Sequence, residues 1–456
     1  MTTIRIFSLF LFTIYLLNIK CALGDNELNK LNKQLSPAKM QQDIDAWREW
    51  LSHTHPNLSI RMAKVAAFDQ AITTLKASLN TPLTNQEFLA KITRLNSQFN
   101  DGHMNIMVNS QSKLTQAILA SGQGLFPFEV IVDKGHLYIS TELGGNKSEY
   151  EKQEITQING RNATAIYADL LERTYGDTPT HREAILSEKF ALYYWLFVSK
   201  ASKFDIEVNT IQGTKSIQVS ASMATPKAQQ NESFDDLFKF EILDNNQALM
   251  TIKLFWWQDK EQFYQFTETA FKQLKKHGIG HLIIDIRHNP GGDDDMWKKG
   301  LLTYLADQPY RHTSRYTKKI IAKYMDEGET AGDIITKNYD HFEQVTHNNP
   351  LAFSGHVSVL IGKVTYSSAI LFANTVQDFD FADLIGEESA GYSWQTGGIQ
   401  FFTFPNSGLK AVSPRFYLER PSGKGKGKSV IPDIYIKDNP LDSREAIIKL
   451  AQLNAK

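Results

Sequence analysis

The sequence predicts an α/β protein whose C-terminal half, residues 232–456, is built around a largely parallel sheet. Two short apolar runs, Leu282–Ile286 and Val357–Ile361, have the composition of buried parallel strands. Between an earlier strand and the first of these runs, apolar residues from Gln262 to Lys276 recur at helical spacing. A strand–helix–strand order of this kind predicts parallel pairing, because parallel neighbours need a crossover connection.

The composition is that of a globular protein with two or three domains. The chain has 456 residues, of which 42% are hydrophobic and 22% charged, and its formal net charge is −1. This near-neutral balance argues against a nucleic-acid partner, which requires a basic excess. A mean hydropathy of −0.33 argues against a polytopic membrane protein, and an aromatic content of 11% argues against disorder.

Residues 1–24 resemble a secretory signal peptide. An apolar run, Ile6–Ile19, follows a short basic start, and Ala22-Leu23-Gly24 offers a cleavage site with small residues. The run is shorter than the about 20 residues that a membrane span requires, although an uncleaved anchor is the alternative. We therefore expect a periplasmic or extracellular protein that is not inserted in a membrane after its signal is removed.

Cleavage after Gly24 would also remove the only cysteine, Cys21. The mature chain would then begin near Asp25 without a disulfide or a thiol nucleophile. Cysteine-based catalysis and zinc sites with cysteine ligands are excluded for such a chain.

Residues 25–115 are expected to form an N-terminal helical region. A helix that contains Trp47 and Leu51 should end before Pro56, because proline restricts the residue preceding it. A second helix is expected from Asn85 to Phe99, and the sequence that follows, Asn100-Asp101-Gly102-His103, has the composition of a turn.

Residues 116–225 are expected to form a small mixed domain. Strands are predicted at 124–130, 136–139 and 155–160, helices at 163–174 and up to Phe197, and a closing hairpin at 204–208 and 216–219.

In the third region, 232–456, two loops follow the predicted buried strands and carry candidate chemistry. The first, Asp285–Gly292, ends in paired glycines, whose backbone N–H groups can approach a reacting oxygen closely. A plain turn is an equally good interpretation, and a phosphate-binding loop lacks its Lys-Ser/Thr. The second, Lys363–Ala369, places Ser367 at the start of a helix, where serine also serves as an ordinary N-cap.

Five motifs in order resemble the carboxyl-terminal processing (tail-specific) serine peptidase family, whose superfamily includes the tricorn core. They are Leu282–Gly292, Thr365-Tyr366-Ser367-Ser368-Ala369, Ile385–Gly391, Phe404–Gly408 and Ile431–Ile434. The resemblance implies a crotonase-like ββα peptidase domain preceded by a PDZ-like module. Residues 120–220 resemble a degenerate version of that module.

The resemblance also implies a set of site residues. The family's nucleophile corresponds to Ser367, and its oxyanion donors correspond to the backbone N–H groups of Gly292 or Gly291 and of Ser368. The tail-specific branch uses a lysine base, but the matching position here is Tyr392. A phenol with a pKa of about 10 does not replace that base.

A tricorn-like branch instead takes its base from a histidine that precedes the PDZ-like module, and this implies His103. An imidazole base predicts activity that rises with pH through about 6.5, shifted by any carboxylate that orients the ring. Glu388 is the candidate for that carboxylate, with Glu387 and Glu419 left open.

The expected function is therefore an exported serine peptidase that acts on a peptide or protein substrate without a cofactor or metal. The acidic run Asp293-Asp294-Asp295 is more typical of a solvated loop than of a metal site. Two alternatives come from other classes: a catalytically inactive peptide-binding scaffold of the same fold, and a crotonase-type lyase or hydratase, which export to a compartment poor in acyl-coenzyme A disfavours. The sequence assigns no oligomeric state.

Overall fold

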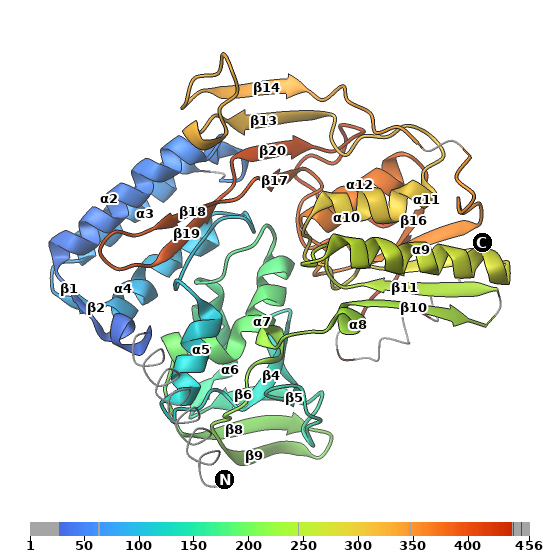
Figure 1. The fold of residues 1–456 in the computed structure, drawn as a ribbon. Helices are drawn as coiled ribbons and strands as arrows, with labels where there is room; N and C mark the ends of the chain where they lie inside the picture. The colour runs from blue at the N-terminus through green and yellow to red at the C-terminus, as the bar shows by residue number, and fades with distance from the viewer. Residues whose placement is uncertain are drawn as a thin grey trace, which may run out of the picture.

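The structure is a computed structural model that describes residues 27–62, 64–244, 246–345, 348–439, 441 and 448. The expected signal peptide, residues 1–24 with Cys21, lies outside these residues. In Figure 1, helices of the N-terminal region lie on one side, an α/β half on the other, and a small mixed domain below them. Within the described ranges, no helix combines the length and apolar character that crossing a bilayer requires.

The α/β half contains a six-stranded sheet in the order β10-β11-β12-β15-β16-β21. Its strands are β10 (Phe238–Leu243), β11 (Gln247–Ile252), β12 (His281–Asp285), β15 (His356–Ile361), β16 (Asp383–Gly386) and β21 (Ile434–Tyr435). Every neighbouring pair is parallel except β10 with β11. The predicted parallel sheet is thus confirmed.

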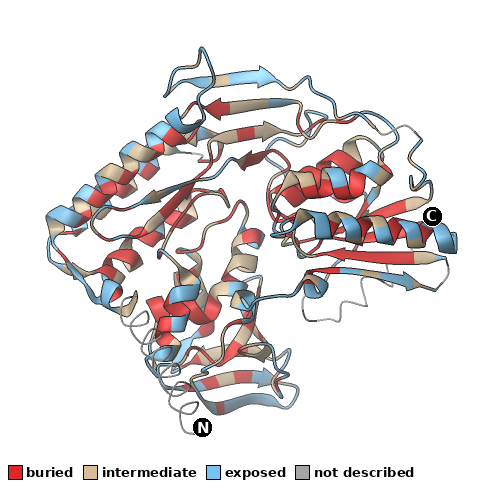
Figure 2. Cartoon of the chain, viewed as in Figure 1, coloured by how far each residue is buried: buried red, intermediate tan, exposed pale blue. Residues whose placement is uncertain are grey.

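Helices precede or connect these strands. They are α8 (Phe234–Leu237), α9 (Lys260–His277), α10 (Asp294–Trp297), a π-helical turn η4 (Lys298–Leu302), α11 (Thr303–Leu305) and α12 (Ser368–Asp378). As predicted, α9 stops at Gly278, whose φ of 62° is left-handed. Figure 2 shows α12 as buried over most of its length, which fixes its first turn firmly in the core.

A four-stranded sheet, β14-β13-β20-β17, lies above α10 and α12 in Figure 1. Its strands are β13 (Arg315–Lys319), β14 (Ile334–Asn338), β17 (Gln395–Gly397) and β20 (Phe416–Glu419), and the short 3₁₀ turn η5 (Ala322–Tyr324) lies between β13 and β14. Between β17 and β20 the chain forms β18 (Gln400–Thr403) and β19 (Lys410–Ser413). Antiparallel pairing of β19 with β3 (Asn105–Met107) joins this C-terminal segment to the N-terminal region.

The N-terminal region is helical, as expected. It contains α2 (Pro37–Thr54), η1 (Leu58–Ile60), α3 (Val65–Ser78), α4 (Asn85–Ile92), η2 (Thr93–Gln98), α5 (Gln111–Ala120) and the short pair β1 (Gln34–Leu35) and β2 (Leu83–Thr84). The predicted helix over 85–99 is divided into α4 and the 3₁₀ turn η2. Trp47 of α2 stacks on Phe404 with 6.3 Å between ring centroids, so this region shares its core with the C-terminal strands.

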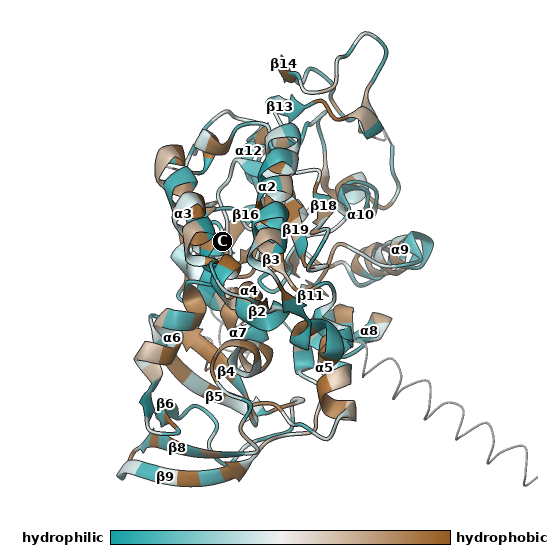
Figure 3. Cartoon of the chain, turned by 90° about the vertical axis from the view of Figure 1, so that its left-hand side faces the viewer, coloured by the Kyte–Doolittle hydropathy of each residue, from teal (hydrophilic) through white to brown (hydrophobic). Residues whose placement is uncertain are grey.

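The mixed domain contains an antiparallel sheet in the order β4-β5-β6-β8-β9. Its elements are β4 (Phe128–Asp133), β5 (His136–Glu142), β6 (Glu154–Ile158), β7 (Arg161–Asn162), α6 (Ala163–Leu171), α7 (Pro179–Phe197), β8 (Lys203–Thr210), β9 (Gly213–Ser220) and the turn η3 (Lys227–Gln229). Hydrophilic and hydrophobic residues alternate along its outer strands in the turned view of Figure 3, as expected for a sheet with one solvated face. Helix α7 packs against the edge strand β4. The Val132 N–H of β4 donates to Ser187 Oγ of α7 over 2.9 Å.

Candidate active site

The two predicted loops meet at one edge of the six-stranded sheet. Strands β12 and β15 are parallel neighbours, so the chain leaves both at their carboxyl ends on the same side. The backbone N–H of Tyr366 donates to the carbonyl oxygen of Asn289 over 3.1 Å. This bond joins the glycine loop to the serine loop.

Ser367 has a strained backbone at the start of α12. Its φ of 53° and ψ of −123° lie in a region that residues with a side chain rarely adopt. Gly291 packs against it, and a Cβ at position 291 would lie 2.7 Å from Ser367 Cβ and 2.9 Å from the Ser368 nitrogen. Glycine is therefore required at 291 for the two loops to approach this closely.

Two of the three expected oxyanion donors have free N–H groups. Neither Gly292 N–H nor Ser368 N–H has a hydrogen-bond partner among the described residues. The N–H of Gly291 instead donates to Asn289 Oδ1 over 2.8 Å, so the inclusion of Gly291 as a possible donor was wrong. Gly291 therefore contributes to the site through close packing and not as an oxyanion donor.

His103 lies beside Ser367, with 3.0 Å between His103 Nε2 and Ser367 Oγ. It comes from the turn between η2 and β3, in the N-terminal region. The pairing of β3 with β19 carries this turn to the α/β half. Two residues far apart in sequence thus come within hydrogen-bond distance.

The other imidazole nitrogen, His103 Nδ1, contacts two hydroxyl groups. Thr396 Oγ1 of β17 lies 2.9 Å away and Tyr366 OH lies 3.2 Å away. Each hydroxyl in turn donates to a carboxylate: Thr396 to Asp101 Oδ1 over 2.8 Å and Tyr366 to Asp177 Oδ1 over 2.9 Å. The imidazole is therefore linked to two carboxylates through hydroxyl groups.

Glu388 does not contact the imidazole. It is exposed at the protein surface, and both hydrogen-bond partners of Nδ1 are the hydroxyls named above. Glu387 lies beside Lys363, with 3.9 Å between the charged atoms, and the backbone carbonyl of Glu419 accepts from Ser314. The expectation of Glu388 as the orienting carboxylate is therefore corrected: Asp101 and Asp177 lie closest to the imidazole.

A buried charge cluster surrounds these carboxylates. Asp177 accepts hydrogen bonds from Gly102 N–H over 2.6 Å and from Tyr392 N–H over 3.0 Å. Arg61 lies 3.7 Å from Asp177 and stacks over the Tyr392 ring at 4.4 Å. Tyr392 therefore contributes both its backbone N–H and its ring to this cluster.

Burial lowers the pKa of His103 to about 4, with His181 and Arg61 acting in the same direction and Asp177 opposing them. The imidazole is neutral at physiological pH and able to accept a proton. The expected titration near 6.5 is corrected downward for this reason. Burial, followed by the charge of Asp177, raises the pKa of Asp101 to about 7.

Ser368 differs from Ser367 in that its hydroxyl is engaged in the core. Ser368 Oγ donates to Asp294 Oδ1 over 2.5 Å and accepts from Trp297 Nε1 over 3.0 Å. Asp294, the middle residue of the acidic run expected to be solvated, is thus a half-buried partner of the serine loop, and desolvation raises its pKa.

Some of these residues carried no recognisable signal in the sequence. Asp101 and Tyr366 are part of motifs already singled out, directly beside the predicted base and nucleophile. Thr396 and Asp177 lie in segments without any motif, and only their contacts identify them. Across the described ranges, no three or more His, Cys, Asp or Glu side chains group in a way that could bind a metal ion.

The segment that contains both loops matches a known family. Residues 247–436 match the model of Peptidase family S41. Over these residues the chain is similar to the S41 serine peptidases. The family consists of serine peptidases, which are hydrolases.

Two curated relatives, both described as a probable CtpA-like serine protease from Staphylococcus epidermidis, are 25% identical to the chain over 183 residues. The aligned part is 40% of this chain and 32% of each relative, so the chain spans about a third of the relatives' length.

Solved structures resemble the chain over most of its length. A structure of mature CPAF complexed with lactacystin has a TM-score of 0.64 at 14% identity and covers 88% of this chain and 94% of its own. Mature CPAF alone gives a TM-score of 0.63 at 13% identity, with 88% and 92% covered. At these identities the likeness concerns the fold, which is the mixed α/β fold of S41 peptidases.

Proposed function

We propose that this protein is an exported serine peptidase that hydrolyses peptide bonds through an acyl-enzyme on Ser367, with His103 as general base. The observation that carries the proposal is the 3.0 Å distance between His103 Nε2 and Ser367 Oγ. A neutral imidazole at this distance can take the hydroxyl proton as the oxygen attacks.

The proposed reaction has two halves. In the first, Ser367 Oγ bonds to the substrate carbonyl carbon, and its proton moves to His103 Nε2. The oxyanion then accepts hydrogen bonds from Gly292 N–H and Ser368 N–H, the amine leaves with the proton from the imidazolium, and an ester remains on Ser367. In the second half, water replaces the amine and the acid product leaves.

The positive charge that forms on His103 needs stabilisation. We assign this to the two hydroxyl-linked carboxylates, Asp101 through Thr396 and Asp177 through Tyr366. The pairing of His103 with Ser367 favours the branch that uses an upstream histidine. The serine–lysine branch is disfavoured, because Tyr392 stands at the position of its lysine.

The domain assignment belongs to the same proposal. We assign residues 25–115 to the N-terminal helical region, 116–225 to a PDZ-like domain and 232–456 to the peptidase domain. One N–H group on the β4 edge is not available to a peptide, because the Val132 N–H donates to Ser187 Oγ over 2.9 Å.

Covalent labelling with a fluorophosphonate tests the activity against the inactive-scaffold alternative. We expect one label per chain, located on Ser367 by peptide mapping, and no label on Ser367→Ala. Ser78→Ala, which changes an exposed serine of α3, is the matched control and should label normally. A wild-type chain that folds but resists the reagent would favour the scaffold.

His103→Ala should lose peptide hydrolysis about as fully as Ser367→Ala. The two residues act as one unit, so the losses should not add in the double variant. Additive losses would indicate that another group serves as the base.

Export is tested by sequencing the N-terminus of the secreted protein. We expect the mature chain to begin near Asp25, in a periplasmic or extracellular location. Recovery of Cys21 in that protein would contradict the proposal.

A further inference from the structure

Trp256, just after β11, is an exposed tryptophan whose ring is not packed into the core. It is 55% exposed, and among the described residues its indole has neither a hydrogen-bond partner nor a ring contact. Its neighbour differs, because Trp257 Nε1 donates to Gln262 Oε1 over 2.8 Å and the Trp257 ring packs against Phe234. Trp257 therefore anchors this segment to the core, whereas the Trp256 indole remains in solvent.

The backbone beside this indole packs against the oxyanion loop. Phe255 forms a parallel bridge with Gly292. The Phe255 N–H donates to the carbonyl oxygen of Gly291 over 2.9 Å, and the Phe255 carbonyl oxygen accepts from Asp293 N–H over 2.5 Å. In such a parallel pair the N–H of Gly292 points away from Phe255, which leaves it free for the oxyanion. A Cβ at position 292 would lie 3.0 Å from the Trp256 nitrogen, so Trp256 lies directly beside the proposed oxyanion donor.

The nucleophile lies on the other side of the same two glycines. A Cβ at position 291 would lie 2.7 Å from Ser367 Cβ. Because consecutive Cα atoms are about 3.8 Å apart, these contacts place the Trp256 nitrogen within about 13 Å of Ser367 Cβ. An extended peptide advances about 3.3 Å per residue, so this distance corresponds to about four residues. A peptide whose cleaved bond lies at Ser367 is therefore long enough to reach Trp256.

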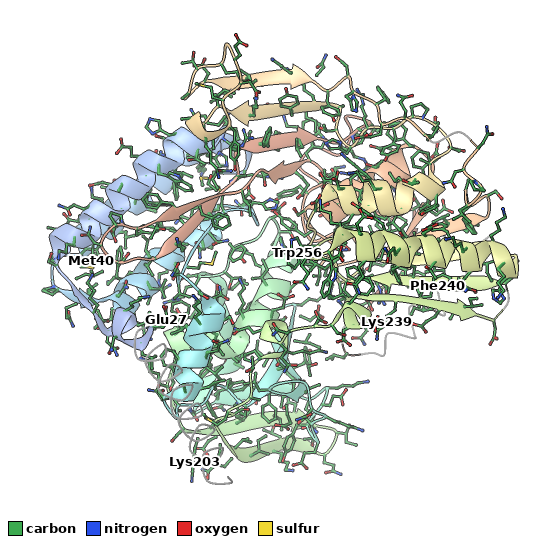
Figure 4. All side chains as sticks on the ribbon, in the orientation of Figure 1. Glu27, Met40, Lys203, Lys239, Phe240 and Trp256 are labelled. Carbon is green, nitrogen blue, oxygen red and sulfur yellow. The ribbon has the colours of Figure 1, made fainter. Side chains whose placement is uncertain are left out.

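The indole is accessible from the same solvent as the site. Ser367 is half-buried, and Gly292 and Trp256 are both exposed. The Phe255 ring packs on Phe372 of α12 with 5.7 Å between centroids, and successive side chains of an extended segment alternate, so the Trp256 side chain points away from α12. In Figure 4, Trp256 lies at the margin of the α/β half that faces the other two regions of the chain.

The charged groups near this indole are paired with one another. Asp293 lies 2.5 Å from Lys260 Nζ, and Asp295 lies 3.0 Å from Lys299 Nζ. Neither carboxylate is therefore left to attract a cationic substrate residue to the face of Trp256. An exposed ring with compensated charges around it is suited to an apolar group.

We propose that the Trp256 indole is a substrate-binding surface for an apolar side chain, aromatic or large aliphatic, within about four residues of the cleaved bond. This inference rests on the proposed peptidase function, because the oxyanion donor fixes where the substrate lies. The flat ring covers apolar area of the substrate residue, and an aromatic residue gains further from edge-to-face or offset stacking. Trp256 is thus a specificity residue that acts on binding and takes no part in the bond changes.

Binding to the Ser367→Ala chain tests the contact without turnover. The probes are dodecapeptides of one fixed, water-soluble sequence in which one position at a time is Phe, Leu, Ala or Lys. At one position we expect Phe and Leu to lower the Kd about tenfold relative to Ala and Lys in calorimetry. This difference should disappear in the Ser367→Ala/Trp256→Ala double variant.

A spectroscopic readout observes the indole itself. The chain has seven tryptophans, and after labelling with 5-fluorotryptophan the resonance of Trp256 is the one that Trp256→Phe lacks. Saturation of the Ser367→Ala chain with the preferred Phe peptide should shift this fluorine resonance, and the Ala peptide should shift it much less. A resonance that stays in place at saturation would overturn the proposal, even if Trp256→Ala failed to fold.

Hydrolysis separates a specificity role from a structural one. For the wild type, kcat/KM for the Phe peptide should exceed that for the Ala peptide about tenfold, mainly through KM. Trp256→Ala should lose this ratio and Trp256→Phe, which keeps a ring, should retain most of it. Ile242→Ala is the matched control, since Ile242 is 43% exposed on β10 and pairs with the start of β11, at the far end from Trp256.

Failure of this surface and failure of the peptidase have different signatures. Fluorophosphonate labelling of the wild type without any apolar preference, or a preference that survives Trp256→Ala, would overturn the surface alone. A preference for Lys would overturn the apolar assignment. Absence of labelling would overturn the peptidase. The calorimetry on Ser367→Ala would then decide the surface separately, and equal affinities for the Phe and Ala peptides, or no binding, would reject it.

Discussion

Thr396→Val tests whether the hydroxyl link to His103 matters for catalysis. The variant keeps the shape of a β-branched side chain and removes only the hydroxyl that lies 2.9 Å from His103 Nδ1 and donates to Asp101 over 2.8 Å. The imidazole becomes charged as the reaction proceeds, and a hydrogen bond to a charged group contributes about 1.5–3 kcal/mol.

At about 1.4 kcal/mol for each factor of ten, this loss lowers kcat/KM by roughly 10- to 100-fold. The effect should remain far below the about 10⁴-fold loss seen when a catalytic histidine loses a directly bonded carboxylate. The reason is that the Tyr366 hydroxyl stays 3.2 Å from Nδ1 and still links the ring to Asp177.

The assay is steady-state hydrolysis of a chromogenic ester, with thermal unfolding as a check on the fold. Thr317→Val is the matched control, because Thr317 lies on β13 of the same sheet and its hydroxyl contacts only Thr336 among the described residues. A folded Thr396→Val chain with kcat/KM within twofold of wild type would refute the reasoning. A loss as complete as that of His103→Ala would refute the second link through Tyr366.

Four further predictions concern residues around the pair. The kcat/KM of the wild type should rise with pH through about 4, not 6.5, because only neutral His103 accepts the proton and burial disfavours its charged form; a pH–rate profile with its acid limb near 6.5 would contradict this. The same depressed pKa means that the unfolded chain binds the extra proton first, so the free energy of unfolding should fall as pH drops from about 6.5 toward 4 in urea titrations. Gly102→Ala should destabilise the fold by about 1–3 kcal/mol and lower activity, since its Cβ would lie 2.6 Å from Tyr366 OH; unchanged melting and activity would show that the turn has room. Ser368→Ala should cost much less activity than Ser367→Ala because the backbone N–H remains, but it should lower stability by about 1–3 kcal/mol, since Asp294 loses a buried partner; reversed activity losses would place the nucleophile one residue later.

Local patterns in the sequence were sufficient to predict the main helices and strands of the α/β half. The spacing of apolar residues in α9 and the glycine at its end predicted that helix. The short apolar runs predicted β12 and β15. These features depend on neighbours within a few residues, so the sequence determines them directly. The motifs around Ser367 and the turn at His103 also singled out the two residues that the structure brings together.

What the tertiary structure decided is how distant segments share one site. Pairing of β3 with β19 brings the His103 turn to Ser367, and β17 adds Thr396 to the imidazole. Asp177 comes from a third segment, between α6 and α7.

The same folding changed two of the expected contributions. It turned the Gly291 N–H toward Asn289, and it left Glu388 on the surface. The sequence determined which residue types were present in each loop. It could not determine which hydrogen-bond partners they meet, because an N–H, a hydroxyl or a carboxylate is paired by whatever group the fold places within about 3 Å of it.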